Sequence, residues 1–446
     1  LGTVRGSDRY SVATSRELII AASKIRPLDV AAVKPYLTST DADLRWAAAY
    51  AVARQRAPSG VSALLDARAP DAKFRAELAR VLTRVTVGDS LRDRALARLR
   101  SLVADPDPYV RISALHSIGT FGATARSPIL LALHDHDANV RVAAAQSSAT
   151  AFDTVATAWR DAWKADTAYK VRRSLLEAAA TRGVTLAGDA EWRASSDWRL
   201  RSAAVGAWSG EVDTARARTV ALEATRDADS RVREAAYGVL IGSDTAHRDS
   251  VVQQALRAAR SDPDSMVRNL IPGSHARMLD TVVVERPLEW YESAVRKNVV
   301  PSLSGHRPRA LMRTVRGRIT ITFDGIRAPL TVLNFATLAE SHAYDNLRFH
   351  RVVPGFVAQD GDPRGDGEGG PGYEIRDELT LLPYARGAVG MALSGPDTGG
   401  SQYFLTLTPQ PHLTGHYTVF GLVTGGLAAM DSLVEGDAIN SIRIRW

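Results

Sequence analysis

Two different spacings of apolar residues divide this chain. Up to about residue 270, alanine and aliphatic residues recur three and four positions apart in short blocks, the spacing that gathers side chains on one face of an α-helix. Beyond about residue 310 the spacing becomes two. In RGRITITF, for example, Ile319, Ile321 and Phe323 alternate with polar residues, which is typical of a half-buried strand. The pattern therefore predicts a helical part followed by a part rich in strands.

The helical part is a repeat. Blocks such as DPDPYVRISALHSIG and DHDANVRVAAAQSSA return about every thirty-two residues, each with an aspartate ahead of an arginine. The aligned arginines are Arg45, Arg75, Arg111, Arg141, Arg172, Arg201, Arg233 and Arg268. Each unit is predicted to be a helix pair in which an aspartate or serine oxygen caps free backbone N–H groups. Because a lone pair cannot bury its apolar face, the pairs are expected to stack into an α-solenoid over residues 1–270.

The repeated arginines have two interpretations. In the structural one, which we favour, each arginine bonds an aspartate or a helix-end carbonyl in its own or the next repeat. In the alternative, the arginines form a basic concave face that grips phosphates. The tryptophans of this part are likewise expected to be packing residues rather than ligand platforms: Trp46, Trp159, Trp163, Trp192, Trp198 and Trp208.

The part rich in strands begins after a proline-interrupted connector over residues 271–310, which holds a short predicted helix around PLEWYESAV. In APLTVLNFATLAE, a stripe of Val332, Phe335, Ala336 and Ala339 predicts another helix. Short strands and glycine-rich loops follow, and the terminal SIRIRW alternates again. Many short strands with few helices predict a closed β-barrel over residues 311–446.

Composition narrows the chemistry. The chain has no cysteine among its 446 residues, which excludes disulfides, thiol catalysis and cysteine-rich zinc sites. No apolar run approaches the length of about eighteen residues that a membrane span needs. The net charge of +7 comes from 56 basic and 49 acidic residues, a mixed surface on which nucleic acid is not the favoured partner. Because the chain starts at Leu1, without methionine or signal peptide, we expect a fragment or processed form, and we favour a bacterial periplasm or envelope over the cytoplasm.

Two segments of the second part hold polar groups among apolar ones. LRFHRVV predicts a continuous strand with Phe349 and Arg351 on one side, and GSQYFLTL places Gln402 and Phe404 on one side of another. An unpaired charge buried in an apolar run is costly, so Arg351 is either an ordinary surface arginine on a strand edge or a cation fixed beside an apolar pocket. Together the two strands predict a small apolar pocket with a few oriented polar groups, which suits a compact apolar ligand attached to an amide.

Three blocks carry a resemblance. FHRVVPGFVAQDGDP, MALSGPDTGGSQYF and HLTGHYTVFGLV resemble, in order and spacing, the signature blocks of cyclophilin-type peptidyl-prolyl isomerases, over residues 311–446. The D-x-x-V-R pattern of residues 11–270 resembles HEAT repeats. The resemblance implies an eight-stranded antiparallel barrel capped by two helices, and an isomerase of X-Pro bonds in protein clients that uses no cofactor and no metal. For the repeats it implies an arm that binds protein.

The resemblance also assigns residues by position. It implies a catalytic group of Arg351, Phe356, Gln359 and Phe404. It implies a substrate-binding group of Val357, Ala392, Leu393, Gln402, His412, Leu413 and Tyr417. Four of these depart from the residues that the family often has, namely Val357, Leu393, His412 and Tyr417. The departures imply weaker cyclosporin binding and a changed preference before proline, with activity retained.

Several alternatives stay open on the residues alone. The aromatic residues of the pocket could be plain barrel core. An acidic loop could bind calcium, although we favour a solvated turn: Asp360, Asp362, Asp366 and Glu368. A zinc site at His412, His416 and Tyr417 lacks cysteine and carboxylate partners. For the whole chain, the alternatives are a non-catalytic scaffold that binds proline segments and a basic arm that binds nucleic acid.

Overall fold

The computed structural model describes residues 11–25, 28–55, 58–84, 90–151, 155–184, 186, 189–210, 214–243, 249–271 and 286–446. Contacts divide the chain into two units, residues 1–252 and 253–446. Among the described residues, no helix is long and apolar enough to cross a membrane. Of the predicted connector, residues 272–285 lie outside the described residues.

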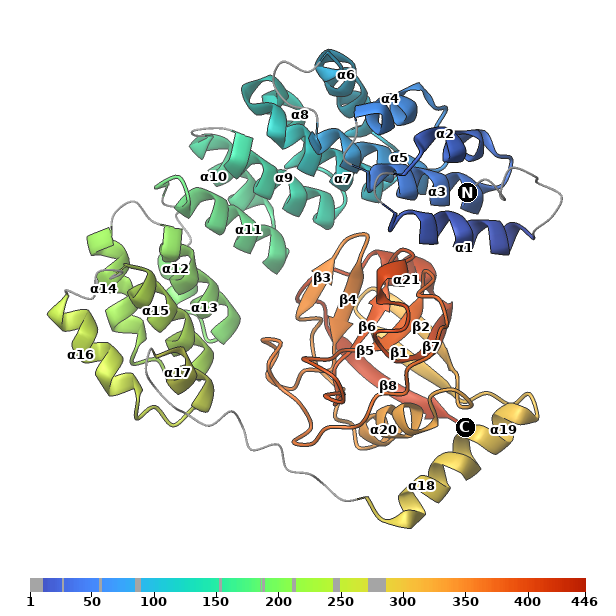
Figure 1. The fold of residues 1–446 in the computed structure, drawn as a ribbon. Coiled ribbons are helices and arrows are strands. Elements are labelled where there is room, and N and C mark those ends of the chain that lie inside the picture. The colour runs from blue at the N-terminus through green and yellow to red at the C-terminus, as the bar shows by residue number, and fades with distance from the viewer. Residues whose placement is uncertain are drawn as a thin grey trace. The chain divides into compact units, whose positions relative to one another are not determined.

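The helical part consists of short helices in succession (Figure 1). They are α1 (Val12–Ala22), α2 (Val30–Val33), α3 (Ala42–Ala53), α4 (Pro58–Asp66), α5 (Ala72–Val81), α6 (Arg92–Leu102), α7 (Pro108–Ile118), α8 (Arg126–Ala132), α9 (Ala138–Ala151), α10 (Ala156–Ala165), α11 (Tyr169–Ala180), α12 (Asp189–Arg193), α13 (Trp198–Gly206), α14 (Thr214–Ala224), α15 (Ser230–Ser243), α16 (Ser250–Ala259) and α17 (Ser265–Leu270).

The helices of one row pack on each other in order: α3 contacts α5, α5 contacts α7, α7 contacts α9 and α9 contacts α11. The side chains between them are mainly alanine and branched aliphatic residues, and they form one buried cluster that runs from Ile19 to Ala207. Small alanine side chains let neighbouring helices approach closely. This repeated stacking confirms the predicted α-solenoid.

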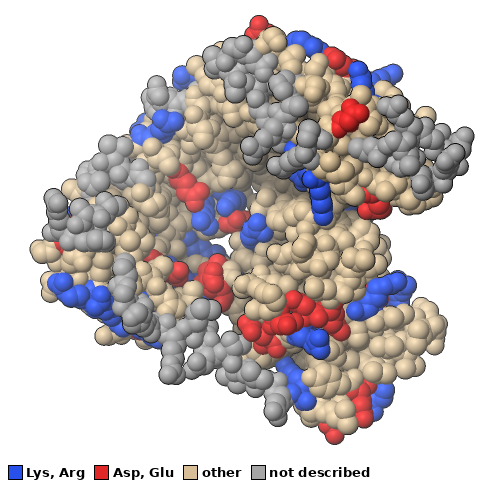
Figure 2. All heavy atoms as spheres, in the orientation of Figure 1, with Lys and Arg blue, Asp and Glu red and all other residues tan. Residues whose placement is uncertain are grey.

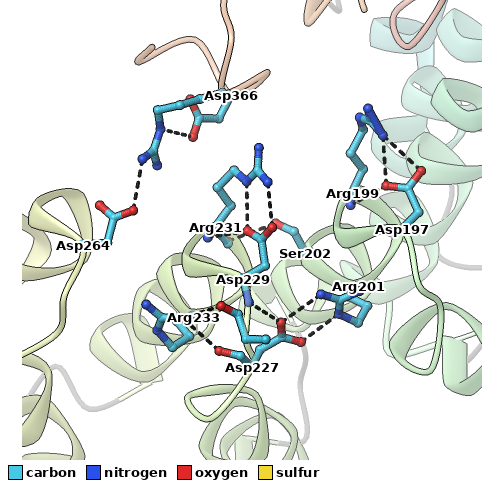
Figure 3. Close-up of polar contacts among 12 residues, drawn as sticks. Asp197, Arg199, Arg201, Ser202, Asp227, Asp229, Arg231, Arg233, Asp264 and Asp366 are labelled. Carbon is cyan, nitrogen blue, oxygen red and sulfur yellow. Dashed lines mark hydrogen bonds and ion pairs between the residues drawn. The ribbon is translucent and has the colours of Figure 1, made fainter. Parts of the chain in front are cut away.

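Charged side chains hold the repeats together. On the face that Figure 2 draws, Lys and Arg stand close to Asp and Glu in several places. Arg75 donates from Nε and Nη2 to the Asp105 carboxylate at 2.6 and 2.9 Å, and from Nη1 to the carbonyl of Pro70 at 2.6 Å. Arg201 bonds Asp227 in the same way, at 2.8 and 2.9 Å (Figure 3). The pattern recurs in the pairs Arg45–Asp71, Arg111–Asp135 and Arg141–Asp166. The structural interpretation of these arginines is confirmed.

Arg172 departs from this pattern. Ser195 stands in the next repeat where the others have an aspartate, and its hydroxyl accepts from the backbone N–H of Asp197. The Arg172 guanidinium lies over the rings of Trp163 and Trp192, 4.3 and 5.4 Å from their centroids. The tryptophans are packing residues, as predicted. Trp198 is half-buried, and five others are buried: Trp46, Trp159, Trp163, Trp192 and Trp208.

The second unit holds an eight-stranded sheet in which every strand pair is antiparallel, in the order β3-β4-β6-β5-β7-β2-β1-β8. The strands are β1 (Arg309–Thr314), β2 (Gly317–Phe323), β3 (Arg351–Val353), β4 (Val357–Asp360), β5 (Ala388–Met391), β6 (Tyr403–Thr406), β7 (Val419–Gly425) and β8 (Ile439–Arg445). A bridge between Arg348 and Ala438 brings the two edges together. Two helices, α20 (Pro329–Glu340) and α21 (Leu427–Asp431), pack on the sheet (Figure 1). The predicted barrel is confirmed.

The barrel core follows the predicted alternation. Ile319, Ile321 and Phe323 of β2 are buried, and Phe323 meets Phe335 of α20 edge to face at a centroid distance of 5.5 Å. The helix predicted around PLEWYESAV is α18 (Leu288–Ala294), continued by a π turn and α19 (Val300–Leu303). It packs on α20, where Asn298 Nδ2 donates to the Pro329 carbonyl at 2.7 Å.

Candidate functional site

A tight turn presents the first part of the site. Between β3 and β4 the chain reverses through Gly355, whose φ of 71° lies in the left-handed region that favours glycine. The Gly355 carbonyl accepts from Thr408 Oγ1 at 2.6 Å and from Gln410 Nε2 at 2.9 Å. This anchored turn fixes Phe356 next to the start of β4.

Arg351 stands at the start of β3, opposite Gln359 of β4. Its Nη1 donates to Gln359 Oε1 at 3.3 Å, and its guanidinium carbon lies 5.4 Å from the centroid of the Phe356 ring. In the described part of the chain, Gln359 is the one side chain that hydrogen-bonds Arg351. The side chain is exposed, so most of its five N–H donors face solvent and are available to a ligand.

The two glutamines form a directed pair. Gln359 Nε2 donates to Gln402 Oε1 at 3.0 Å, and Gln402 Nε2 donates to the carbonyls of Gly367 and Gly369 at 2.7 and 2.8 Å. Both Gln402 amide protons are therefore engaged by the loop. Its oxygen must then face Gln359, which leaves the Gln359 oxygen for Arg351.

Asp362 holds the loop that orients Gln402. Its carboxylate accepts from the backbone N–H groups of Arg364, Asp366 and Gly367 at 2.7, 2.8 and 2.5 Å. Asp362 is buried, with 1% of its surface exposed, and these three bonds compensate its desolvation. The loop therefore fixes Gln402, Gln402 orients Gln359, and Gln359 bonds Arg351.

An apolar pocket lies beside the arginine. Val357, Phe404 and Leu413 are buried in one cluster, and Phe356 packs against it. The ring of Tyr384 stacks behind Phe404 at a centroid distance of 5.6 Å. The Tyr384 hydroxyl donates to the Thr418 carbonyl at 3.2 Å, and burial raises its pKa. The pocket therefore has a rigid rear wall.

The other predicted residues line the same site. Tyr417 meets Phe404 edge to face at 5.9 Å, and the exposed His412 stacks on Phe356 at 5.8 Å. The Ala392 N–H donates to the Gln402 carbonyl at 3.0 Å, which places Ala392, and Leu393 after it, beside the glutamine pair.

Two sequence interpretations are wrong. LRFHRVV is not one continuous strand: the chain bends at His350, so Phe349 is buried in the barrel core while Arg351 is exposed. The acidic loop is not wholly a solvated turn either, because Asp360 and Asp362 are buried and only Asp366 and Glu368 are exposed. Among the described residues, no group of three His, Asp or Glu side chains is arranged to hold a metal ion.

The sequence did not predict the role of Tyr384 behind the pocket, or the role of Asp362 in holding the loop. Tyr384 lies twenty residues before Phe404, outside the three blocks, and nothing local marked it. Asp362 was visible only as one acid among four. Its burial could have been suspected from the glycines around it, which let the backbone fold over a carboxylate.

Comparisons with known proteins agree with this geometry. Residues 309–445 match the model of the family described as cyclophilin type peptidyl-prolyl cis-trans isomerase/CLD, and residues 63–149 match that of HEAT repeats. The peptidyl-prolyl cis-trans isomerase B of Bacillus subtilis is 51% identical over 119 residues, which are 26% of this chain and 83% of that protein. A peptidyl-prolyl cis-trans isomerase of Helicobacter pylori is 46% identical over 137 residues, 30% of this chain and 84% of that protein.

The solved structure of a cyclophilin type peptidyl-prolyl cis-trans isomerase of Cryptosporidium parvum is 31% identical, with a TM-score of 0.30. The match covers 31% of this chain and 98% of the chain in that structure. The family match falls on the barrel and the residues described above. The chain therefore belongs to the cyclophilin-type peptidyl-prolyl cis-trans isomerases and carries its isomerase domain behind HEAT repeats.

Proposed function

We propose that the chain catalyses cis–trans isomerisation of X-Pro bonds in polypeptide clients that its HEAT repeats bind, and so acts as a folding helper. One observation carries the proposal: Arg351 is held by Gln359 at the rim of an apolar pocket, with most of its N–H donors uncommitted. We assign residues 1–270 to the binding arm, 271–310 to a connector and 311–446 to the isomerase domain.

The reaction needs no bond to break. Amide conjugation holds the peptide bond planar behind a barrier of about 18–20 kcal/mol. As the bond twists, the prolyl nitrogen becomes pyramidal and regains its lone pair. A guanidinium N–H aimed at that nitrogen stabilises the twisted form more than the planar one, which is the condition for catalysis. A rate gain on the order of 10⁵ requires about 7 kcal/mol of this preference.

The neighbouring residues supply the geometry. The proline ring fits the apolar walls made by Phe356, Phe404 and Leu413, while the preceding carbonyl rotates outside the pocket. Gln402 orients Gln359, and Gln359 keeps Arg351 in place and has its second amide N–H left for the client backbone. Each group acts by its position and charge, so the proposed reaction requires only side chains of the chain itself.

The repeats serve the isomerase by raising the local concentration of clients. Once a client is bound to the repeats, its binding to the isomerase site is intramolecular. The effective concentration of the client at that site is then set by the connector. Ion pairs between repeats already occupy five of the aligned arginines, as in Arg75–Asp105 and Arg201–Asp227. Their engagement favours a protein-binding arm over a phosphate-binding one.

A chromogenic proline tetrapeptide tests the proposal. The full chain should accelerate cis-to-trans relaxation in proportion to its concentration. If the peptide binds without acceleration, the alternative of a non-catalytic proline-binding scaffold is correct. Binding of duplex DNA by the full chain with a steep salt dependence would instead support the nucleic-acid alternative.

A further inference from the structure

A carboxyl group lies in the core of the barrel, one residue from the site. Asp360 ends β4 and has 0% of its surface exposed. Side chains alternate along a strand, so Asp360 shares the inward side with Ala358 of the core cluster, while Gln359 points to Arg351. Opposite Asp360 on β6 stands the buried Tyr403.

The Asp360 carboxyl is only partly satisfied. Oδ1 accepts from the Gly361 N–H at 2.6 Å, whereas Oδ2 is buried and meets no hydrogen-bond partner among the described residues. The hydroxyl of Tyr403 is buried without a partner in the same part of the structure, and that of Tyr344 donates to the Ser401 carbonyl at 3.1 Å. Among the described residues, the charged group that acts on Asp360 is the Asp362 carboxylate, which has the same sign and compensates nothing.

These surroundings favour the neutral acid. An ionised carboxylate without a counter-ion is strongly disfavoured in an apolar core, whereas a protonated one needs only ordinary hydrogen bonds. Burial, and then the charge of the neighbouring Asp362, raise the pKa of Asp360 to about 8, even though the backbone N–H groups of Gly361 and Asp362 act to lower it. At neutral pH the side chain therefore carries its proton.

Ionisation of Asp360 would act on the site through β4. This strand pairs with β3 through three residues only, and the Arg351–Gln359 pair is one of the three. A charge placed behind Gln359 is relieved most easily if the end of β4 moves toward water, which breaks the contact between Gln359 and Arg351. We propose that Asp360 is a positioning residue that must be protonated for β4 to hold Gln359 and Arg351 in their catalytic arrangement.

This inference rests on the proposed isomerase function, and a pH profile of kcat/KM tests it. A protease-free assay follows a tetrapeptide that has no titrating group between pH 6 and 9.5. Wild-type activity should fall above pH 8, to about a tenth of its neutral value at pH 9, because about a tenth of Asp360 is then protonated. Asp360→Asn, a neutral group of the same shape, should stay within twofold of its own pH 7 value up to pH 9.

The matched control is Asp431→Asn, which removes an exposed carboxylate that pairs with Arg386 and should keep the wild-type profile. A flat wild-type profile to pH 9.5, or an Asp360→Asn profile that falls in parallel, overturns the inference. Asp360→Ala is the second neutral variant if Asp360→Asn does not fold.

Two further readouts on the full chain are independent of catalysis. A ¹³C carboxyl titration of wild type should show the Asp360 proton leaving near pH 8, and titration below pH 5 overturns the inference. Thermal unfolding should show wild type losing stability from about pH 4 to about pH 8 relative to Asp360→Asn, since over that range the folded state holds a proton that the unfolded state has lost. If the chain shows no isomerase activity at any pH, the proposed function fails while these readouts still decide whether Asp360 is protonated.

Discussion

Gln402→Glu is the substitution that tests the glutamine pair most sharply, because it changes one NH₂ group into an oxygen and almost nothing in size. In the wild type, Nε2 donates to the Gly367 and Gly369 carbonyls at 2.7 and 2.8 Å. A carboxylate oxygen at that place would face two carbonyl oxygens at hydrogen-bond distance. The side chain must turn away, and Gln359 loses its acceptor at the same time.

The magnitude follows from the bonds lost. Three neutral hydrogen bonds are lost, two to the loop carbonyls and one from Gln359, at about 1 kcal/mol each, and repulsion from the two carbonyls adds about 1 kcal/mol more. If the loss appears in the transition state, about 4 kcal/mol lowers kcat/KM by roughly 1000-fold.

The assay is kcat/KM on the proline tetrapeptide at pH 7, with circular dichroism to confirm that the barrel is folded. Gln402→Met is the control, since it removes the bonds without adding a charge, and it should lose less activity than Gln402→Glu. A folded Gln402→Glu variant with activity within threefold of wild type would refute the orienting role of the pair.

Two further predictions concern packing and the repeats. In Gly390→Ala the new Cβ would overlap Phe404 Cζ and Tyr384 Oη, so the pocket wall should shift and activity fall at least about tenfold, and unchanged kinetics would contradict this. Burial raises the pKa of Asp227, but the hydrogen bonds from Arg201 and from the Asp229 N–H together outweigh it, so the pKa is lowered. Asp227→Asn should therefore cost about 1–3 kcal/mol at pH 7, measured by thermal unfolding, and the deficit should shrink below pH 4; an equal melting temperature at pH 7 would contradict it.

The repeats were predictable because their signal is local and periodic. An aspartate ahead of a helix and an arginine within it recur in each unit. The sequence therefore predicts that Arg75 bonds an aspartate or a helix-end carbonyl in its own or the next repeat, and the structure gives Asp105 and the Pro70 carbonyl. Arg172 could not be foreseen in the same way, since its place over Trp163 and Trp192 depends on how three helices meet.

The residues of the site could be predicted from the sequence, but the path of the backbone between them and the burial of Asp360 could not. Alternation failed at His350, where the chain bends because Phe349 enters the core while Arg351 must stay at the surface. The burial of Asp360 also escaped the sequence pattern. A polar residue before a glycine indicates a turn, and only the pairing of β4 with β6 shows that this one lies inside the barrel.

The most direct test of the account is kcat/KM of Arg351→Ala on the proline tetrapeptide, measured together with the Kd of the peptide. Removal of the guanidinium should lower kcat/KM at least about 100-fold, because the donor to the twisted prolyl nitrogen is lost. The Kd should change by less than about fivefold, because the apolar walls at Phe404 and Leu413 remain. An Arg351→Ala variant that keeps wild-type activity would contradict the account.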